Sequence, residues 1–183
     1  MGSEMCIRDR FKPSDYPVIG EGSFTARRIE VDGRGEGPRW SDCGPVTLED
    51  SFLRIRGADE GTPACDEVHS DGAQAVAGVG GVARNNTIIF QTSCGTSPWF
   101  ITDPSTNSGT YIVDRLLVSG GGYTFRQNMP GSVTGLNIVD GAWVYGPLDQ
   151  MDCSVLTHWD AKLVNIDANY QVTRVVRDQP CAM

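Results

Sequence analysis

The chain has 183 residues, of which 39% are hydrophobic, and this size and composition suit one globular domain rather than two. Its formal net charge of -8 would repel a phosphate backbone, so we expect no nucleic-acid partner. No run approaches the roughly 18 consecutive apolar residues that cross a bilayer, so the sequence predicts no membrane span.

The first ten residues are left out of the fold prediction. Residues 5–10 have the sequence MCIRDR, which resembles translated sequencing adapter of the kind found at the ends of environmental assemblies. We therefore expect residues 1–10 to be an artefact, residues 11–183 to form the domain, and the true N-terminus to be missing. On that expectation, the lack of a signal peptide says nothing about secretion.

Beyond this segment the sequence predicts many short strands. The 22 Gly and 10 Pro favour strands joined by tight turns over long helices. An early strand is expected over 24–33, and later strands over 46–50, 82–86, 110–114 and 136–140. The later four end at Asp50, Asn86, Asp114 and Asp140, with a wide first spacing and two shorter, similar ones. Such spacings are typical of repeat arrays, whose periods run from about 20 to 50 residues.

A second set of strands is expected at 71–75, 97–101 and 121–125. If side chains alternate along each strand, Ala73, Trp99 and Tyr123 form one inward row, and Ala75, Ile101 and Phe125 form another. Parallel crossovers are nearly always right-handed. The sequence therefore predicts an all-β right-handed parallel β-helix with three parallel sheets, a single-stranded solenoid truncated at its N-terminus, with 163–176 as its last coil or C-terminal cap. The four polar strand ends should lie in one line and cap turns.

Three runs carry a family resemblance: HSDGAQ at 69–74, GGVARNNTI at 80–88 and GGGYT at 120–124. They are similar to bacterial right-handed β-helix repeat proteins of the pectate-lyase-like superfamily, and the resemblance covers residues 24–176. The H-x-D-G-x-Q run is more specific than the strand repeats. The resemblance implies a secreted protein, extracellular or periplasmic, that acts on or binds polysaccharide. It does not fix a reaction, because this fold hosts lyases, hydrolases, epimerases and binding proteins.

The candidate catalytic residues are His69, Asp71 and Arg126. His69 and Asp71 lie two positions apart beside a strand start, where an imidazole and a carboxylate can share one proton-transfer site. Arg126 can hold a uronate carboxylate and neutralise charge that develops at the adjacent carbon. The alternative is structural: Asp71 and Gln74 bond the backbone of a turn, and His69 is a surface loop residue.

The candidate substrate-binding residues are Gln74, Phe100 and Thr124. If the inward rows are assigned correctly, an outward strip should begin at His69 and Asp71 and run along the coils across these three residues to Arg126, which is slightly displaced from their row. The alternative for Arg126 is an ordinary ion pair with Asp149 or Asp103.

Two further clusters have structural alternatives that we favour. The segment 158–160, His-Trp-Asp, can stack on a sugar ring, yet its tryptophan more often closes the core under a cap. The acidic pairs at 59–60 and 66–67 suggest calcium, the one cofactor we consider, although a solvated acidic loop is the simpler interpretation. Paired-aspartate hydrolase motifs are not visible, which disfavours hydrolysis by two carboxylates.

The cysteines indicate disulfides rather than a metal site. Apart from Cys6 there are five, none in a C-x-x-C pair, and the chain has only two His, so no metal ligands are assigned. Spacings close to one coil predict that Cys65 pairs with Cys94 and Cys153 with Cys181. Cys43 with Cys65 is the next choice.

The sequence thus leads to three functional hypotheses. The first is a secreted enzyme that acts on polysaccharide as a lyase or epimerase of acidic glycans. The second is a non-catalytic carbohydrate-binding or surface module that uses the same strip. The third is a purely structural spike or stalk, which would neither bind nor turn over a glycan.

Overall fold

The computed structural model describes residues 19–21, 23–41, 44–56, 70–91 and 95–181, and within these ranges it contains two β-sheets and no α-helix. The six-stranded sheet has the order β1 (Ile19–Glu21), β4 (Arg39–Ser41), β7 (Asp71–Ala75), β9 (Ser97–Ile101), β11 (Tyr123–Gln127) and β13 (Gly146–Leu148). The nine-stranded sheet contains β2 (Phe24–Arg27), β3 (Glu30–Arg34), β5 (Val46–Glu49), β6 (Phe52–Ile55), β8 (Val79–Phe90), β10 (Ser108–Ser119), β12 (Gly131–Val139), β14 (Leu156–Ile166) and β15 (Val172–Asp178).

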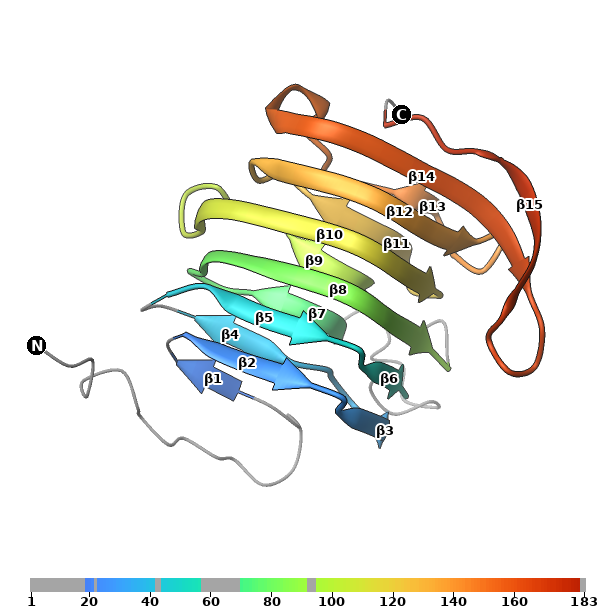
Figure 1. The fold of residues 1–183 in the computed structure, drawn as a ribbon, viewed down its shortest axis with the longest axis horizontal. Coiled ribbons are helices and arrows are strands. Elements are labelled where there is room, and N and C mark those ends of the chain that lie inside the picture. The colour runs from blue at the N-terminus through green and yellow to red at the C-terminus, as the bar shows by residue number, and fades with distance from the viewer. Residues whose placement is uncertain (1–18, 22, 42–43, 57–69, 92–94, 182–183) are drawn as a thin grey trace, which may run out of the picture.

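From β7 to β14 successive strands alternate between the two sheets, which lie one behind the other in Figure 1. The strand pairings of the six-stranded sheet are parallel, as are those of the nine-stranded sheet up to β14. Only β15 is antiparallel to its neighbour, β14, among the described pairs. The predicted all-β fold with extensive parallel sheets is therefore confirmed. The described strands form two sheets rather than the three predicted, because the chain bends within the nine-stranded sheet without leaving it. No helix in the described ranges is long and apolar enough to cross a membrane.

A column of aromatic rings fills the core. Trp40, Trp99 and Phe125 are almost fully buried, and the ring centroid of Trp99 lies 6.3 Å from those of Trp40 and Phe125. Trp159 meets Phe125 edge-on at 6.0 Å. The Nε1 of Trp99 donates to Oε1 of Gln127 at 3.0 Å, so this buried polar atom is satisfied. The prediction that Trp159 closes the core is confirmed.

The inward rows differ from the prediction by two residues at β11. Ala73 pairs with Trp99 as expected, but Trp99 pairs with Phe125 rather than with Tyr123. The reason is that Gly120 and Gly121 have φ of +90° and +83° and form the turn, so the strand begins only at Tyr123. The predicted strand 121–125 began inside this turn.

A column of bends crosses the nine-stranded sheet. At one level of the sheet, five residues from neighbouring strand segments have φ between +50° and +63°, a conformation that non-glycine residues adopt rarely. These residues are Arg28, Asp50, Asn85, Arg115 and Gly135. The residues just before them pair in register from β2 to β12, so the chain bends at the same level in each segment.

The four polar strand ends do not lie in one line, so that prediction is wrong. Asp114 pairs with Arg84, two positions before Asn86, and Asp140 lies beyond the end of β12. The bend in the chain carries Asp50 next to Asn85 instead. Hydrophobic periodicity does not reveal where a strand bends, and this is why the alignment slipped.

Turn capping, the favoured role of this polar set, is confirmed for Asn86. Its Oδ1 accepts from the N–H of Ser51 at 3.0 Å, and its Nδ2 donates to the carbonyl of Leu48 at 2.8 Å. Asn86 is almost fully buried. It therefore satisfies two backbone groups of the neighbouring segment that have no access to water.

A hairpin with a disulfide ends the described chain. Cys153, in the 3-10 helix η3 (Cys153–Val155), is bonded to Cys181, which confirms that predicted pair. The hairpin of β14 and β15 extends back along the sheet, where the ring of Tyr170 meets that of Phe52 at 5.2 Å. The other predicted pair, and the alternative that includes Cys43, lie outside the described residues.

Candidate functional site

Of the six residues predicted for the outward strip, Gln74, Phe100 and Arg126 face outward, Asp71 and Thr124 are buried, and His69 lies outside the described residues. Gln74 pairs with Phe100 and Phe100 with Arg126, and all three are partly exposed on the face opposite the core. Arg39 extends the row at one end, because it pairs with Gln74. Asp149 extends it at the other, next to Arg126. We call this set of five residues the outer row: Arg39, Gln74, Phe100, Arg126 and Asp149.

Thr124 does not belong to the outer row, so its predicted outward position is wrong. Its side chain is fully buried and its hydroxyl donates to the carbonyl of Gly120 at 3.1 Å. Phe125, the next residue, is fully buried too. Two consecutive buried residues break the alternation on which the prediction rested.

Two aromatic rings and a carboxylate surround Arg126. Its guanidinium carbon lies 4.8 Å from the ring centroid of Tyr123 and 5.3 Å from that of Phe100, both within cation-π range. Its Nη2 forms an ion pair with Oδ2 of Asp149 at 2.8 Å. The Arg126 side chain is only 12% exposed, so the pair is largely shielded from solvent. The structural alternative for Arg126, an ion pair with Asp149, is the arrangement observed.

Asp71 is a buried carboxylate close to this cation. It is 3% exposed, and no hydrogen bond of good geometry reaches either of its oxygens from the described residues, although the N–H of Ser97 lies close enough to favour the charged form. Burial raises the pKa of Asp71 to about 7, and the nearby charge of Glu36 adds to the rise. Arg126, then the backbone N–H of Ser97 and then Arg39 act against it. The structural alternative, in which Asp71 contacts backbone, is therefore partly present, with the backbone of the neighbouring strand β9 rather than that of a turn.

Unmatched hydrogen-bonding atoms gather around this carboxylate. The Oγ of Ser70 and the Nε of Arg126 are also buried without a partner in the described part of the chain. Buried polar groups are nearly always satisfied in folded proteins. The carboxyl of Asp71 has a pKa near neutrality, and two unmatched donors belong to residues close to it. Sites that bind polar ligands or transfer protons often have such features.

The glycine of the H-x-D-G-x-Q run has a packing role. A Cβ at Gly72 would lie 2.4 Å from the carbonyl oxygen of Pro98 and 2.5 Å from Cγ2 of Ile88. No side chain fits there without moving a neighbouring strand. Gln74 belongs to the outer row, whereas His69 lies outside the described residues and its predicted role is untested.

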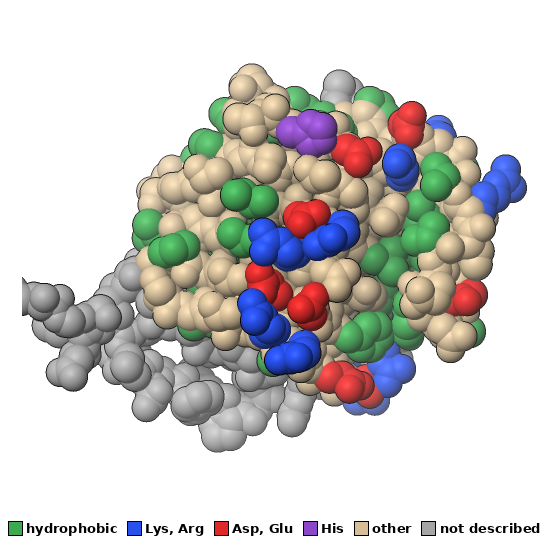
Figure 2. Space-filling view, in the orientation of Figure 1, with side chains coloured by type: hydrophobic (Ala, Val, Ile, Leu, Met, Phe, Trp, Pro, Cys, Tyr) green, Lys and Arg blue, Asp and Glu red, His purple; other side chains and the backbone are tan. Residues whose placement is uncertain are grey.

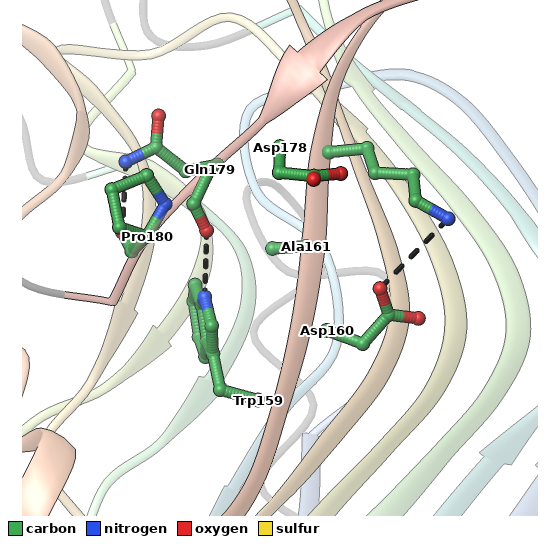
Figure 3. Close-up of a pocket in the computed structure, with 7 residues that line it drawn as sticks. Trp159, Asp160, Ala161, Asp178, Gln179 and Pro180 are labelled. Atoms are coloured by element: carbon green, nitrogen blue, oxygen red, sulfur yellow. Dashed lines mark hydrogen bonds and ion pairs between the residues drawn. The ribbon is translucent and has the colours of Figure 1, made fainter.

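The second sequence cluster, at 158–160, is engaged in structural contacts. Nε1 of Trp159 donates to the carbonyl of Gln179 at 2.7 Å, and Oδ2 of Asp160 accepts from the N–H of Gly135 at 3.1 Å. Figure 3 shows these side chains around an open depression of about 520 Å³ between β14 and β15. Asp160 there pairs with Lys162 at 3.9 Å. Its polar groups are occupied by one another, so this depression is a weaker candidate than the outer row.

No metal centre is apparent in the described residues, where no three His, Cys, Asp or Glu side chains come together. The acidic pairs considered for calcium, at 59–60 and 66–67, lie outside those residues.

Sequence reasoning missed three contributors to the site: Arg39, Glu36 and the ring of Tyr123. A signal for Arg39 was available in principle, because Gln74, Phe100 and Arg126 follow one another at a constant interval. The longer interval back to Arg39 concealed it. Tyr123 was assigned to the core because its strand was taken to begin two residues early.

No protein-family model, curated protein or solved structure matches this chain, so its site is interpreted from its own geometry.

Proposed function

We propose that this protein binds an acidic polysaccharide along the outer row of the six-stranded sheet. The observation that carries the proposal is the register of Gln74, Phe100 and Arg126 on three neighbouring strands, extended by Arg39. Neighbouring strands lie about 4.8 Å apart, so the four residues in register from Arg39 to Arg126 extend over about 14 Å. An extended chain of several sugar units can contact all of them at once.

The residue types of the row suit an acidic glycan. An arginine can hold a carboxylate by two parallel hydrogen bonds. The rings of Phe100 and Tyr123 offer flat apolar surface beside it, and the amide of Gln74 can both donate to and accept from hydroxyl groups. Recognition would then combine charge, stacking and hydrogen bonding on a rigid sheet.

Turnover by a lyase or epimerase mechanism is the second candidate function: the pKa of Asp71 favours it, whereas the 3% exposure of Asp71 opposes direct contact with a substrate. A base works best when its pKa is near the working pH, and the pKa of Asp71 is about 7. In both mechanisms the base removes the proton from the carbon next to the uronate carboxylate, while Arg126 balances the charge that develops there. In a lyase the electron pair then forms a carbon–carbon double bond as the glycosidic oxygen leaves. His69 remains a further predicted base.

We also propose a specific fold class and a cellular compartment for this protein. The alternation of strands between two parallel sheets supports a right-handed parallel β-helix of the pectate-lyase-like kind. A disulfide between Cys153 and Cys181 supports an oxidising compartment, extracellular or periplasmic, because such bonds are rare in the cytosol.

A binding and turnover assay tests the proposal. The full chain is titrated at low salt with polygalacturonate, alginate and a neutral glucan, and ultraviolet absorbance reports any unsaturated product. Arg126→Ala should abolish binding of the acidic polymers. Arg84→Ala removes a paired arginine from the other sheet and should leave binding unchanged.

The outcomes separate the three hypotheses. Binding together with new absorbance supports a lyase, and binding without product supports a binding module or an epimerase, which proton exchange with deuterated water distinguishes. Binding that survives Arg126→Ala, or the absence of binding to any polymer, contradicts the proposal and leaves the structural hypothesis.

A further inference from the structure

We infer that Asp149 is an internal competitor of the ligand: its carboxylate occupies the edge of Arg126 that a uronate carboxylate must reach, and an acidic glycan binds only as Asp149 is displaced. This inference rests on the function proposed above. It adds a residue that weakens acidic ligands and thereby determines how tightly the site holds them.

The rings beside Arg126 direct an incoming anion to the edge of its guanidinium. Tyr123 and Phe100 pack against the guanidinium, at 4.8 Å and 5.3 Å from its central carbon. Tyr123 is itself held by the ring of Tyr145 at 5.6 Å. The N–H groups of a guanidinium point outward in its plane, so a carboxylate must approach at that edge. At that edge Nη2 already bonds Asp149 at 2.8 Å.

Asp149 can move, whereas Asp71 cannot. Asp149 follows the last residue of β13, and its N–H donates to the carbonyl of Phe125 at 3.3 Å, so the backbone remains fixed while the side chain turns. Its side chain is 22% exposed, which gives it a route to solvent. Asp71 is buried behind the row at 3% exposure. Displacement therefore falls on Asp149.

The charge balance makes displacement necessary. Two carboxylates, Glu36 and Asp149, lie near the two arginines of this site, Arg39 and Arg126, and buried Asp71 adds part of a negative charge near neutral pH. A ligand carboxylate would add a further negative charge to arginines that are already balanced, and like charges at close range oppose each other. Exchange of Asp149 for the ligand keeps one carboxylate on Arg126. A neutral sugar needs no such exchange.

The test compares Asp149→Asn with the wild-type chain. Affinities for oligogalacturonate and for a neutral glucan oligomer are measured by calorimetry at low salt. Loss of an ion pair of this kind corresponds to a fold-change of about five, so oligogalacturonate should bind roughly five-fold tighter to the variant. Affinity for the neutral oligomer should not change. Asp114→Asn removes a paired carboxylate from the other sheet and serves as the matched control.

Each outcome decides the inference. Tighter acidic binding by Asp149→Asn supports it, even where wild-type binding is too weak to detect. Unchanged binding overturns it, and weaker binding overturns it too, because Asp149 would then be a positioning residue that orients Arg126. In both cases the proposed function survives if Arg126→Ala still abolishes binding. If neither chain binds any uronate, the inference and the proposed function fail together.

Discussion

The two sheets carry charge in different ways. On the nine-stranded sheet Arg27, Glu49, Arg84 and Asp114 pair in register from β2 to β10, and Figure 2 shows acidic and basic side chains alternating over this face. Each of the four has an opposite charge beside it. We call this set the charge ladder. On the six-stranded sheet the outer row instead joins an aromatic ring and an amide to its charges.

The difference indicates which face is structural. In the charge ladder Glu49, with a side chain 11% exposed, bonds both Arg27 and Arg84, so its charge is matched within the sheet. Beside the outer row, Asp71 is buried, and no hydrogen bond of good geometry reaches its carboxylate from the described residues. Unmatched buried polarity reduces stability, and such features are concentrated at functional sites.

The largest expected effect is on the pH dependence of stability through Asp71. Its pKa is about 7 in the folded protein against an ordinary value of 3.8. Between these values the folded protein keeps a proton that the unfolded chain has lost, so stability falls as pH rises through this window, by up to about 4 kcal/mol. Asp71→Asn should flatten this fall in urea denaturation.

The control is Asp50→Asn, which changes an exposed carboxylate on the other sheet. It should leave the slope close to that of the wild-type chain. A wild-type stability that is flat across this window would mean that Asp71 is solvated, and the contrast between the faces would lose its main support.

The second prediction concerns the structural face, at Asn86. Asn86→Ala leaves the N–H of Ser51 and the carbonyl of Leu48 unpaired in the core, which should destabilise the fold by about 3 kcal/mol. Asn85→Gly is the matched control, because Asn85 is exposed and glycine accepts its positive φ. Equal losses for the two variants in urea denaturation would contradict the buried capping role.

The third prediction compares a carboxylate from each face. Glu49→Gln weakens two ion pairs and should lower the free energy of unfolding by about 1 to 2 kcal/mol, less at high salt. Asp149→Asn weakens one ion pair and should change it by about 1 kcal/mol or less. Thermal unfolding at low and high salt measures both. A larger stability loss at Asp149 would place that residue among the structural charges.

The smallest expected effect is at Phe100. Phe100→Leu removes one cation-π contact of Arg126, worth about 0.5 to 1 kcal/mol, so acidic-glycan affinity should fall roughly threefold with little change in stability. Phe52→Leu removes a ring contact on the other sheet and should not affect binding. Calorimetric titration of both variants checks this, and equal affinities would remove Phe100 from the binding surface.

Prediction from the sequence was most successful where equivalent strand residues recur at a constant interval. Gln74, Phe100 and Arg126 recur at a constant interval, and the predicted register of Gln74 with Phe100 is the one observed, whereas Arg126 takes the place predicted for Thr124. It was least successful where strands bend or begin irregularly. Thr124 was placed outward because strict alternation was assumed, although Thr124 and Phe125 are both buried.

The charge interactions of the site could not be predicted from the sequence either. The raised pKa of Asp71 depends on burial and on Glu36, which lies far earlier in the chain. No local pattern links such residues, because only the packing of neighbouring strands brings them together. The pairing of Arg126 with Asp149 was one of two alternatives, and the fold decided between them.

The bond between Cys153 and Cys181 has a mechanical consequence. It closes a covalent loop around β14 and β15, so a pull on the residues after Cys181 passes directly to Cys153, just before the start of β14. The hairpin then carries no tension. In the reduced protein the same pull would detach β15 from its antiparallel partner one hydrogen bond at a time. The oxidised protein should therefore resist force at its C-terminal end until β14 itself leaves the sheet.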